Sequence, residues 1–231
     1  MVTGGTASFT RIERRSNFVR VGARNYIQGV AIADAIVDTI LDGAATFERA
    51  NTRFSVVKFK RKTVCNGVIV VLPDAVEADL PADAACVAWG QLSPGGPFAA
   101  ALVPDANSLV ARHIARDDLQ ISQFVPNGHF GGRCEVAWND RTSFLKTLVE
   151  VDKLAILAGV ESAAAPVAEI VSVMDLNVPS TVENYRGHLT VACKGQRWIG
   201  TRAYLLSTIS WAQATAAESV TFVFSLDGVT S

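Results

Sequence analysis

The sequence lacks the usual signs of a secreted, membrane-spanning or metal-binding protein. Its four cysteines, Cys65, Cys86, Cys134 and Cys193, include no CxxC pair, so we predict free thiols in a reducing cytosol. The first thirty residues hold five arginines and no apolar core, which is unlike a secretory signal. No apolar run reaches the ~18–20 residues of a membrane span. We expect no membrane association and no cofactor.

Recognisable metal-binding and catalytic motifs are absent as well. The histidines His113, His129 and His188 are scattered, which gives a zinc site no local spacing. There is no GxSxG motif, and the glycine-rich pieces "SPGGP" and "GHFGG" lack the Lys-Ser/Thr of a phosphate loop. A cupin would need a histidine-rich motif, which "ARHIARDD" does not supply. The sequence therefore predicts that the chain is not an enzyme.

One acid-rich stretch is the remaining candidate for a catalytic or calcium site. Between two apolar runs, 68–72 and 84–89, lie four carboxylates: Asp74, Glu77, Asp79 and Asp83. Glycosidase chemistry needs two acids facing one cleft, normally from strand faces, whereas these acids share a connection with Pro73 and Pro81. A loop could supply calcium ligands, but EF-hand spacing is missing. We interpret the stretch as a solvated connection.

Charge is unevenly distributed along the chain. Residues 1–62 hold eleven Lys/Arg against five Asp/Glu, and residues 63–231 hold ten against seventeen. A basic N-terminal end is typical of a charged arm that contacts phosphates without reading sequence. A solubilising tail and a charged edge strand remain alternatives. The residues predicted to bind RNA are Arg11, Arg14, Arg15, Arg20, Arg24, Lys58, Lys60, Arg61 and Lys62.

The N-terminal quarter of the chain predicts an arm and a helix. Residues 1–25 are rich in Gly, Thr, Ser and Arg without periodicity, so we predict a flexible basic arm over 1–25 and one domain over 26–231. In "AIADAIVDTILDGAATF" apolar residues recur at helical spacing, with Asp34, Asp38 and Asp42 on the other face. This pattern predicts an amphipathic helix that packs on a core.

From Phe54 onward the hydrophobic period changes to two, which predicts strands. The Asn66-Gly67 step predicts a hairpin between the strands "FSVVKFKRKT" and "GVIVVLP". "SPGGP" predicts a turn between the strands "ACVAWGQL" and "FAAALV", and "CEVAW" is also strand-like. "NSLVARHIARDDL" predicts a short surface helix.

The C-terminal half continues this pattern. "DRTSFLKTL" predicts one or two helical turns, and "KLAILAGV" and "VAEIVSVMDLNV" predict two strands. "RAYLLSTISW" and "ESVTFVFSLDG" predict a last hairpin, with Val220, Phe222, Phe224 and Leu226 on one face. Many short strands without a β-α-β rhythm predict a mainly β fold. We expect an antiparallel jelly-roll sandwich of about eight to ten strands with a few short helices.

The order of these pieces resembles the coat proteins of bromovirus-like plant RNA viruses. The resemblance covers roughly Asn66 to Ser180 and rests on "VIVVLPDAVEADL", "AACVAWGQLSPGGPFAAALV" and "FLKTLVEVDKLAILAGVESAAAPVAEIVSVMDLNVPST". It implies a jelly-roll capsid protein. The third of these stretches resembles the closing hairpin of the coat proteins. Coat proteins of other small plant viruses, such as ourmiaviruses, are similar in length.

The resemblance implies a self-assembling structural protein. Many copies would form an icosahedral or bacilliform shell around single-stranded RNA, with the arm inside, in a virion assembled in the host cytoplasm. The apolar, alanine-rich composition suits such a shell, because subunit contacts absorb apolar surface. The alternative is a cytosolic, non-enzymatic β-sandwich module that binds RNA or an acidic partner.

Overall fold

The computed structural model of the chain divides into two compact units. The first comprises residues 1–117 and 177–181, and the second comprises residues 118–176 and 182–231. The structure describes residues 11–21, 29–43, 51–93, 95–113, 119–160, 167–179, 184–200, 202–212 and 217–227.

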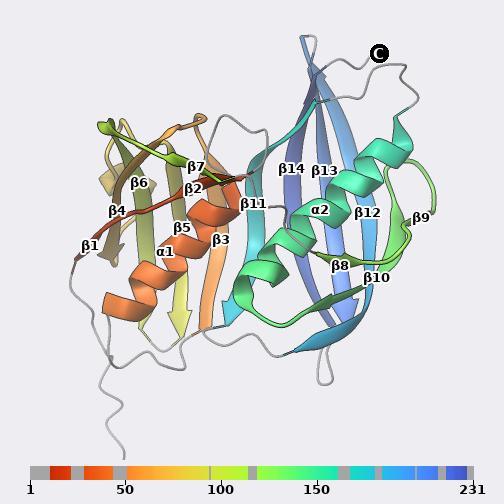
Figure 1. Cartoon of the computed structure of the whole chain (residues 1–231), viewed down its shortest axis with the longest axis horizontal. Coiled ribbons are helices and arrows are strands. Elements are labelled where there is room, and N and C mark those ends of the chain that lie inside the picture. The colour runs from red at the N-terminus through yellow and green to blue at the C-terminus, as the bar shows by residue number, and fades with distance from the viewer. Residues whose placement is uncertain are drawn as a thin grey trace, which may run out of the picture. The chain divides into compact units, whose positions relative to one another are not determined.

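In the first unit a helix lies across an antiparallel sheet (Figure 1). The sheet order is β1-β4-β6-β5-β3, and the helix α1 contacts β1, β4, β6 and β3. Two further strands, β2 and β7, pair with each other in parallel, and a single 3-10 turn, η1, connects β4 to β5. The bounds are β1 Ile12–Arg15, β2 Val19–Val21, α1 Gly29–Gly43, β3 Asn51–Phe59, β4 Cys65–Pro73, η1 Glu77–Asp79, β5 Cys86–Ser93, β6 Gly96–Leu109 and β7 Ala111–His113.

The second unit also places a helix against an antiparallel sheet. Its order is β8-β10-β12-β13-β14-β11, with β9 added to β10, and the helix α2 contacts β10, β12 and β13. The last residues of β11, from 177 on, group with the first unit. The bounds are β8 Gln120–Ile121, β9 Val125–Pro126, β10 Gly132–Trp138, α2 Arg141–Gly159, β11 Val167–Pro179, β12 Tyr185–Ile199, β13 Arg202–Ala212 and β14 Ala217–Asp227.

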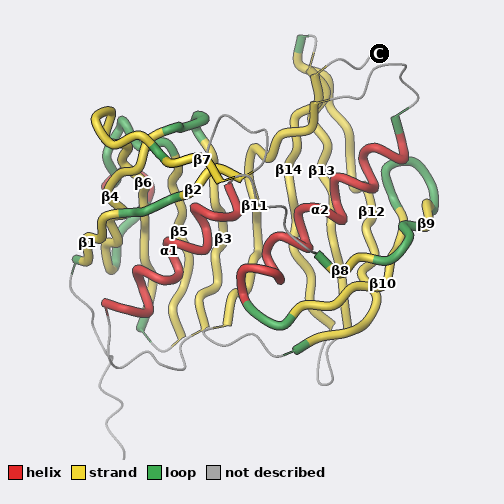
Figure 2. The backbone as a smooth tube through the Cα atoms, in the orientation of Figure 1, coloured by secondary structure: helices red, strands yellow, loops and turns green. Residues whose placement is uncertain are grey.

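The two units share one chain plan, which Figure 2 shows as a single long helix over strands in each. In the first unit, β1 precedes the helix and β3 follows it, and they lie on opposite sides of the later strands β4, β6 and β5. In the second, β10 precedes and β11 follows the helix, on opposite sides of β12, β13 and β14. The chain is therefore an architectural duplicate, although no fixed-period repeat is visible in its sequence.

The predicted N-terminal helix is confirmed over the residues that the structure describes. Ile36, Val37 and Ile40 of α1 are buried, and Asp42 on the opposite face is exposed. The buried side chains come at positions i, i+1 and i+4, the spacing that points one stripe of a helix to a core. The last predicted residues, 44–47, lie outside the described part of the chain.

The structure corrects the strand predicted at "KLAILAGV". These residues continue the short helix predicted before them, so that one helix of 19 residues, α2, replaces a helix and a strand. Leu148, Val151, Ala155 and Ile156 are buried at helical spacing on α2. The polar residues around Lys153 interrupt the apolar pattern, which makes the apolar run that follows, residues 154–158, resemble a strand.

Asp140 determines where α2 begins, and its removal should weaken the second unit. Its carboxylate accepts a hydrogen bond from the backbone N–H of Ser143 at 2.6 Å. Asp140→Ala is expected to lower the free energy of unfolding by about 1 kcal/mol, because an unpaired N–H is left in the first turn. Urea denaturation checks this, with Asp83→Ala as control, since exposed Asp83 contacts Arg61 only through its backbone carbonyl. Equal effects of the two changes would contradict the capping role.

Two further local predictions in the first unit are wrong. The Asn-Gly step does not close a hairpin, because β4 pairs with β1 and β6 while β3 pairs with β5. The side chain of Asn66 instead accepts a hydrogen bond from the N–H of Phe18 at 2.7 Å. The surface helix predicted from Asn107 onward is replaced by the end of β6, which pairs with β4 as far as Leu109, and by β7. Long-range pairing overrides local propensity at both places.

The coarse fold prediction is confirmed, because the described residues form fourteen strands and two α-helices, and nearly all strand pairs are antiparallel. The arrangement is not the predicted sandwich of two sheets, since each unit packs a helix on its sheet. The predicted flexible arm, residues 1–25, contains β1 and β2, and residues 26–231 fall into both units. Neither helix, as far as it is described, is long and apolar enough to span a membrane.

Candidate functional site

A buried carboxylic acid in the middle of α2 is the most unusual polar residue of the second unit. The side chain of Asp152 is 0% exposed, and Ser207 on β13 is 2% exposed. The hydroxyl of Ser207 donates to Oδ2 of Asp152 at 2.5 Å, whereas Oδ1 is buried and has no protein partner. Buried carboxylates are normally fully hydrogen-bonded. Asp152 therefore has one oxygen with a hydrogen bond and one buried oxygen without a hydrogen-bond partner.

Local sequence patterns bring Asp152 and Ser207 together. Along β13, alternate residues point inward, and Leu205, Ser207 and Ile209 are all buried. On α2, Asp152 follows Leu148 by four residues, so both lie on the buried face of the helix. Each element thus places one polar group in an otherwise apolar stripe.

Burial makes Asp152 a weak acid. Loss of solvent raises its pKa from 3.8 to about 7, and the hydrogen bond from Ser207 opposes this rise in part. Near neutral pH the carboxyl group is therefore present in both protonation states. A group with such a pKa can both accept and donate a proton, and perturbed pKa values of this kind are enriched at active sites.

Other unpaired polar atoms lie inside the same unit. The hydroxyl of Thr147 on α2 and the indole N–H of Trp211 on β13 are buried without a hydrogen-bond partner. Trp211 packs edge-on against Trp138, with ring centroids 6.4 Å apart, and against Phe144 at 5.7 Å. Such orphaned groups are uncommon in protein cores. Together with Asp152 they make the α2–β13 interior more polar than its function as a core requires.

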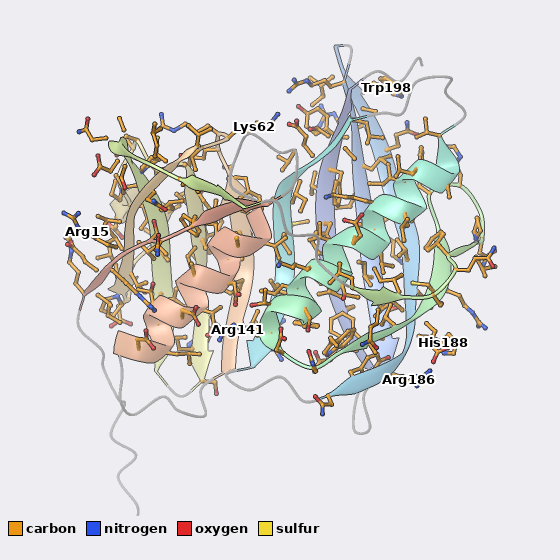
Figure 3. The ribbon with its side chains drawn as sticks, viewed as in Figure 1. Arg15, Lys62, Arg141, Arg186, His188 and Trp198 are labelled. Atoms are coloured by element: carbon orange, nitrogen blue, oxygen red, sulfur yellow. The ribbon has the colours of Figure 1, made fainter. Side chains whose placement is uncertain are left out.

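The described histidines and metal-ligand types do not add to this site. His129 and His188 are exposed, and Figure 3 shows His188 next to Arg186 on β12. The side chain of His113 lies outside the described residues. Among the residues that are described, no group of three His, Cys, Asp or Glu side chains could hold a metal ion. Asp152 is thus the fully buried carboxyl group of the described part of the second unit.

The acid-rich stretch between β4 and β5 is a solvated connection, as predicted. Asp74, Asp79 and Asp83 are exposed. Glu77 forms ion pairs with Lys58 and Lys60 at 3.6 and 3.7 Å. The exposure of these three aspartates and the ion pairs of Glu77 are what a solvated connection predicts.

The predicted RNA-binding residues all belong to the first unit, and several are paired with acids. Arg11 contacts Glu13 and Arg14 contacts Asp42, while Arg61 donates to the backbone carbonyl of Asp83. Figure 3 shows Arg15 on β1 and Lys62 beyond β3. The side chain of Arg20 and all of Arg24 lie outside the described residues. RNA binding by these residues stays a prediction.

The four cysteines are free thiols, as predicted. Burial raises the pKa of Cys86, and it raises the pKa of Cys134 to about 11. A thiol with a raised pKa is a poor nucleophile, because the thiolate is the reactive form. Neither cysteine therefore competes with Asp152 as a candidate for catalysis.

Comparison with solved structures shows which fold this is. The dehydratase domain from the CurJ module of curacin polyketide synthase matches with a TM-score of 0.57 and 8% identity, covering 98% of this chain and 94% of that chain. An inactive mutant of the CurJ dehydratase in complex with a compound gives 0.52 and 8%, covering 98% and 93%. Both are hotdog folds, in which an antiparallel sheet wraps a helix. No protein-family model and no curated protein matches the sequence. The likeness therefore shows the fold alone.

This finding overturns the coat-protein interpretation. The structural neighbours are enzyme domains with the hotdog fold rather than jelly-roll capsid proteins. The capsid function, the virion location, the prediction of a non-enzyme and the alternative of a non-enzymatic binding module are all contradicted. The resemblance failed at a definite place, because the piece taken as a closing hairpin is α2 followed by β11. Self-assembly and RNA as a partner remain untested.

Sequence reasoning missed Asp152 because it divided α2 beside this residue. Had "RTSFLKTLVEVDKLAILAG" been taken as one helix, Asp152 would have been an acid on its apolar face, four residues after Leu148 and three before Ala155. A charged residue in such a stripe is an identifiable signal. Its partner Ser207 had no comparable signal, because serine is common in strands of this kind.

Proposed function

We propose that the chain is an enzyme that acts on acyl compounds, with Asp152 as its acid–base group. The observation that carries this is the buried carboxyl with one oxygen fixed by Ser207 and the other unpaired. The fold supports the proposal, because the hotdog neighbours are dehydratase domains of a polyketide synthase.

The reaction proposed is reversible loss of water from a 3-hydroxyacyl thioester. The carboxylate of Asp152 takes the proton at C2, the C2–C3 double bond forms, and the C3–O bond breaks. The acid formed in the first step then gives its proton to the departing hydroxyl, which leaves as water. One carboxyl can perform both transfers when its pKa lies near the working pH, and that of Asp152 is about 7.

The buried residues near Asp152 along α2 and near Ser207 along β13 favour an apolar substrate. Leu148, Val151 and Ala155 of α2 are buried, as are Leu205 and Ile209 of β13. A charged group would lose its hydration there without compensation, whereas a neutral acyl chain would not. The polar part of the substrate would therefore be limited to the hydroxyl and the thioester carbonyl.

Asp152→Asn tests the proposal directly. The full chain is incubated with 3-hydroxyacyl N-acetylcysteamine thioesters of increasing chain length and with the matching 2-enoyl thioesters, and the products are quantified by mass spectrometry. We expect conversion by the wild type and a loss of kcat/KM of at least about 100-fold in Asp152→Asn, since asparagine cannot transfer the proton.

The matched control is Glu150→Gln on the same helix. Glu150 lies 3.8 Å from Lys153 in a partly exposed ion pair, so the change should leave kcat/KM within about twofold. Full activity in Asp152→Asn, or a wild type that converts none of these thioesters, would refute the proposed function.

A further inference from the structure

The hydrogen bond between Ser207 and Asp152 joins the two main elements of the second unit. Ser207 is the donor, from the middle of β13, and Asp152 accepts from the middle of α2. Their oxygens are 2.5 Å apart, at the short end of the range for a hydroxyl donating to a carboxylate. Both side chains are buried, so water does not compete for this contact.

The strand that carries Ser207 lies between two paired strands. Ser207 pairs with Cys193 on β12 and with Phe222 on β14, so its backbone is fixed from both sides of β13. A hydroxyl has few rotamers, and here its carrier strand cannot shift without breaking two ladders of hydrogen bonds. The position of Oδ2 is therefore set by the sheet rather than by α2 alone.

Holding one oxygen determines the other. The hydrogen bond from Ser207 to Oδ2 restricts rotation of the carboxyl group and so orients Oδ1. That oxygen is buried and has no partner in the described protein. A buried carboxylate oxygen needs a hydrogen-bond donor, and under the proposed function the hydroxyl of the substrate is that donor.

We propose that Ser207 is a positioning residue that orients Asp152, so that Oδ1 is the oxygen that exchanges the proton with the substrate. The inference rests on the proposed function, and it assigns a role to a residue that does not itself meet the substrate. In this proposal the two oxygens of Asp152 have different roles. Oδ2 accepts the hydrogen bond from β13, and Oδ1 exchanges the proton with the substrate.

The neighbouring residue on the same strand provides a matched control. Thr208 carries a hydroxyl on the opposite face of β13, where it lies 3.3 Å from the hydroxyl of Thr221. Thr208→Ala therefore removes a hydroxyl from the same strand without touching Asp152. Ser207→Ala removes the donor, Ser207→Thr keeps it, and Ser207→Cys replaces it by a weaker donor of similar size.

The first measurement is independent of activity. Asp152 is labelled through ¹³C-aspartate, and its carboxyl is followed by infrared difference spectroscopy during a pH titration, with Asp152→Asn identifying its band. The hydrogen bond favours the charged form, so its loss should move the midpoint upward by roughly one pH unit in Ser207→Ala. Ser207→Cys should move it in the same direction by less, and Ser207→Thr and Thr208→Ala should leave it unchanged.

The second measurement is the pH dependence of kcat with the thioester substrates. We expect kcat to fall about tenfold or more in Ser207→Ala with little change in KM, the pH midpoint to rise with the titration, and Ser207→Thr to restore both. An unchanged titration in Ser207→Ala and Ser207→Cys, alongside an inactive Asp152→Asn, would overturn the positioning role and leave the proposed function standing. If the midpoint shifts in Ser207→Ala but the wild type converts none of the thioesters, the proposed function is refuted, and the positioning role with it.

Discussion

Asp152→Asn is expected to stabilise the protein above pH 7 while it abolishes activity. The pKa of Asp152 is about 7 in the folded protein, against 3.8 for the free side chain. Folding therefore holds a proton that the unfolded chain releases, and the contribution of Asp152 to stability is largest below pH 4. It falls as pH rises from about 4 to 7, by roughly 4 kcal/mol in total, and is then constant. Asparagine carries no charge at any pH and avoids this loss.

The measurement is urea denaturation of both proteins between pH 5 and pH 8, followed by tryptophan fluorescence. We expect the variant to exceed the wild type by roughly 2–4 kcal/mol at pH 8, with a smaller difference at pH 5. Burial also raises the pKa of Glu218, so both proteins keep a weaker slope of the same sign. Parallel curves for wild type and variant would show that Asp152 does not carry the pH dependence. Glu150→Gln, whose parent residue is partly exposed, should follow the wild type.

Gly67→Ala should be among the most damaging single changes in the first unit. Gly67 lies where the register of β4 against β6 shifts, and a Cβ built there would lie 2.1 Å from the carbonyl oxygen of Val103. Because that atom belongs to the backbone of a paired strand, relief requires the two strands to separate. We expect a loss of about 3 kcal/mol or more, the range of severe local disruptions.

A second glycine at a similar bulge gives the control. Gly195 follows Cys193 where the register of β12 against β13 shifts, just as Gly67 follows Cys65 on β4. A Cβ at Gly195 would meet no atom within 4 Å. Gly195→Ala should therefore change the free energy of unfolding, measured by urea denaturation, by no more than about 0.5 kcal/mol. Comparable losses from both changes would mean that the close approach at Val103 is not the cause.

The sequence predicted local elements where hydrophobic periodicity was undisturbed. Val220, Phe222, Phe224 and Leu226 are all buried on one face of β14, as their alternation indicated. In α2 the prediction failed where polar residues, Glu150, Asp152 and Lys153, fell inside a periodic run. At Asp152 this turned one helix into a helix and a strand. The group that misled the assignment is the one around which we now place the site.

Strand pairing could not be predicted, because the sequence does not state which strands meet. The Asn66-Gly67 step indicated a contact between neighbours in sequence, whereas β4 pairs with β1 and β6. Many antiparallel proteins share short strands separated by turns, so the same pattern resembled a coat protein. A long helix packed against each sheet distinguishes the observed fold from a jelly roll. The sequence prediction contained one of these helices, α1, but divided the other, α2, into a short helix and a strand.

The shared chain plan has a consequence for the order in which the protein is made. A ribosome releases β10, α2 and β11 before the three strands that separate β10 from β11 exist. In particular, β11 pairs with β14, the last strand that the structure describes. Until residue 227 has emerged, the nascent second unit therefore leaves the apolar face of α2 and the β14-pairing edge of β11 uncovered. We therefore expect this topology to increase the need for chaperones during translation rather than the stability of the finished fold.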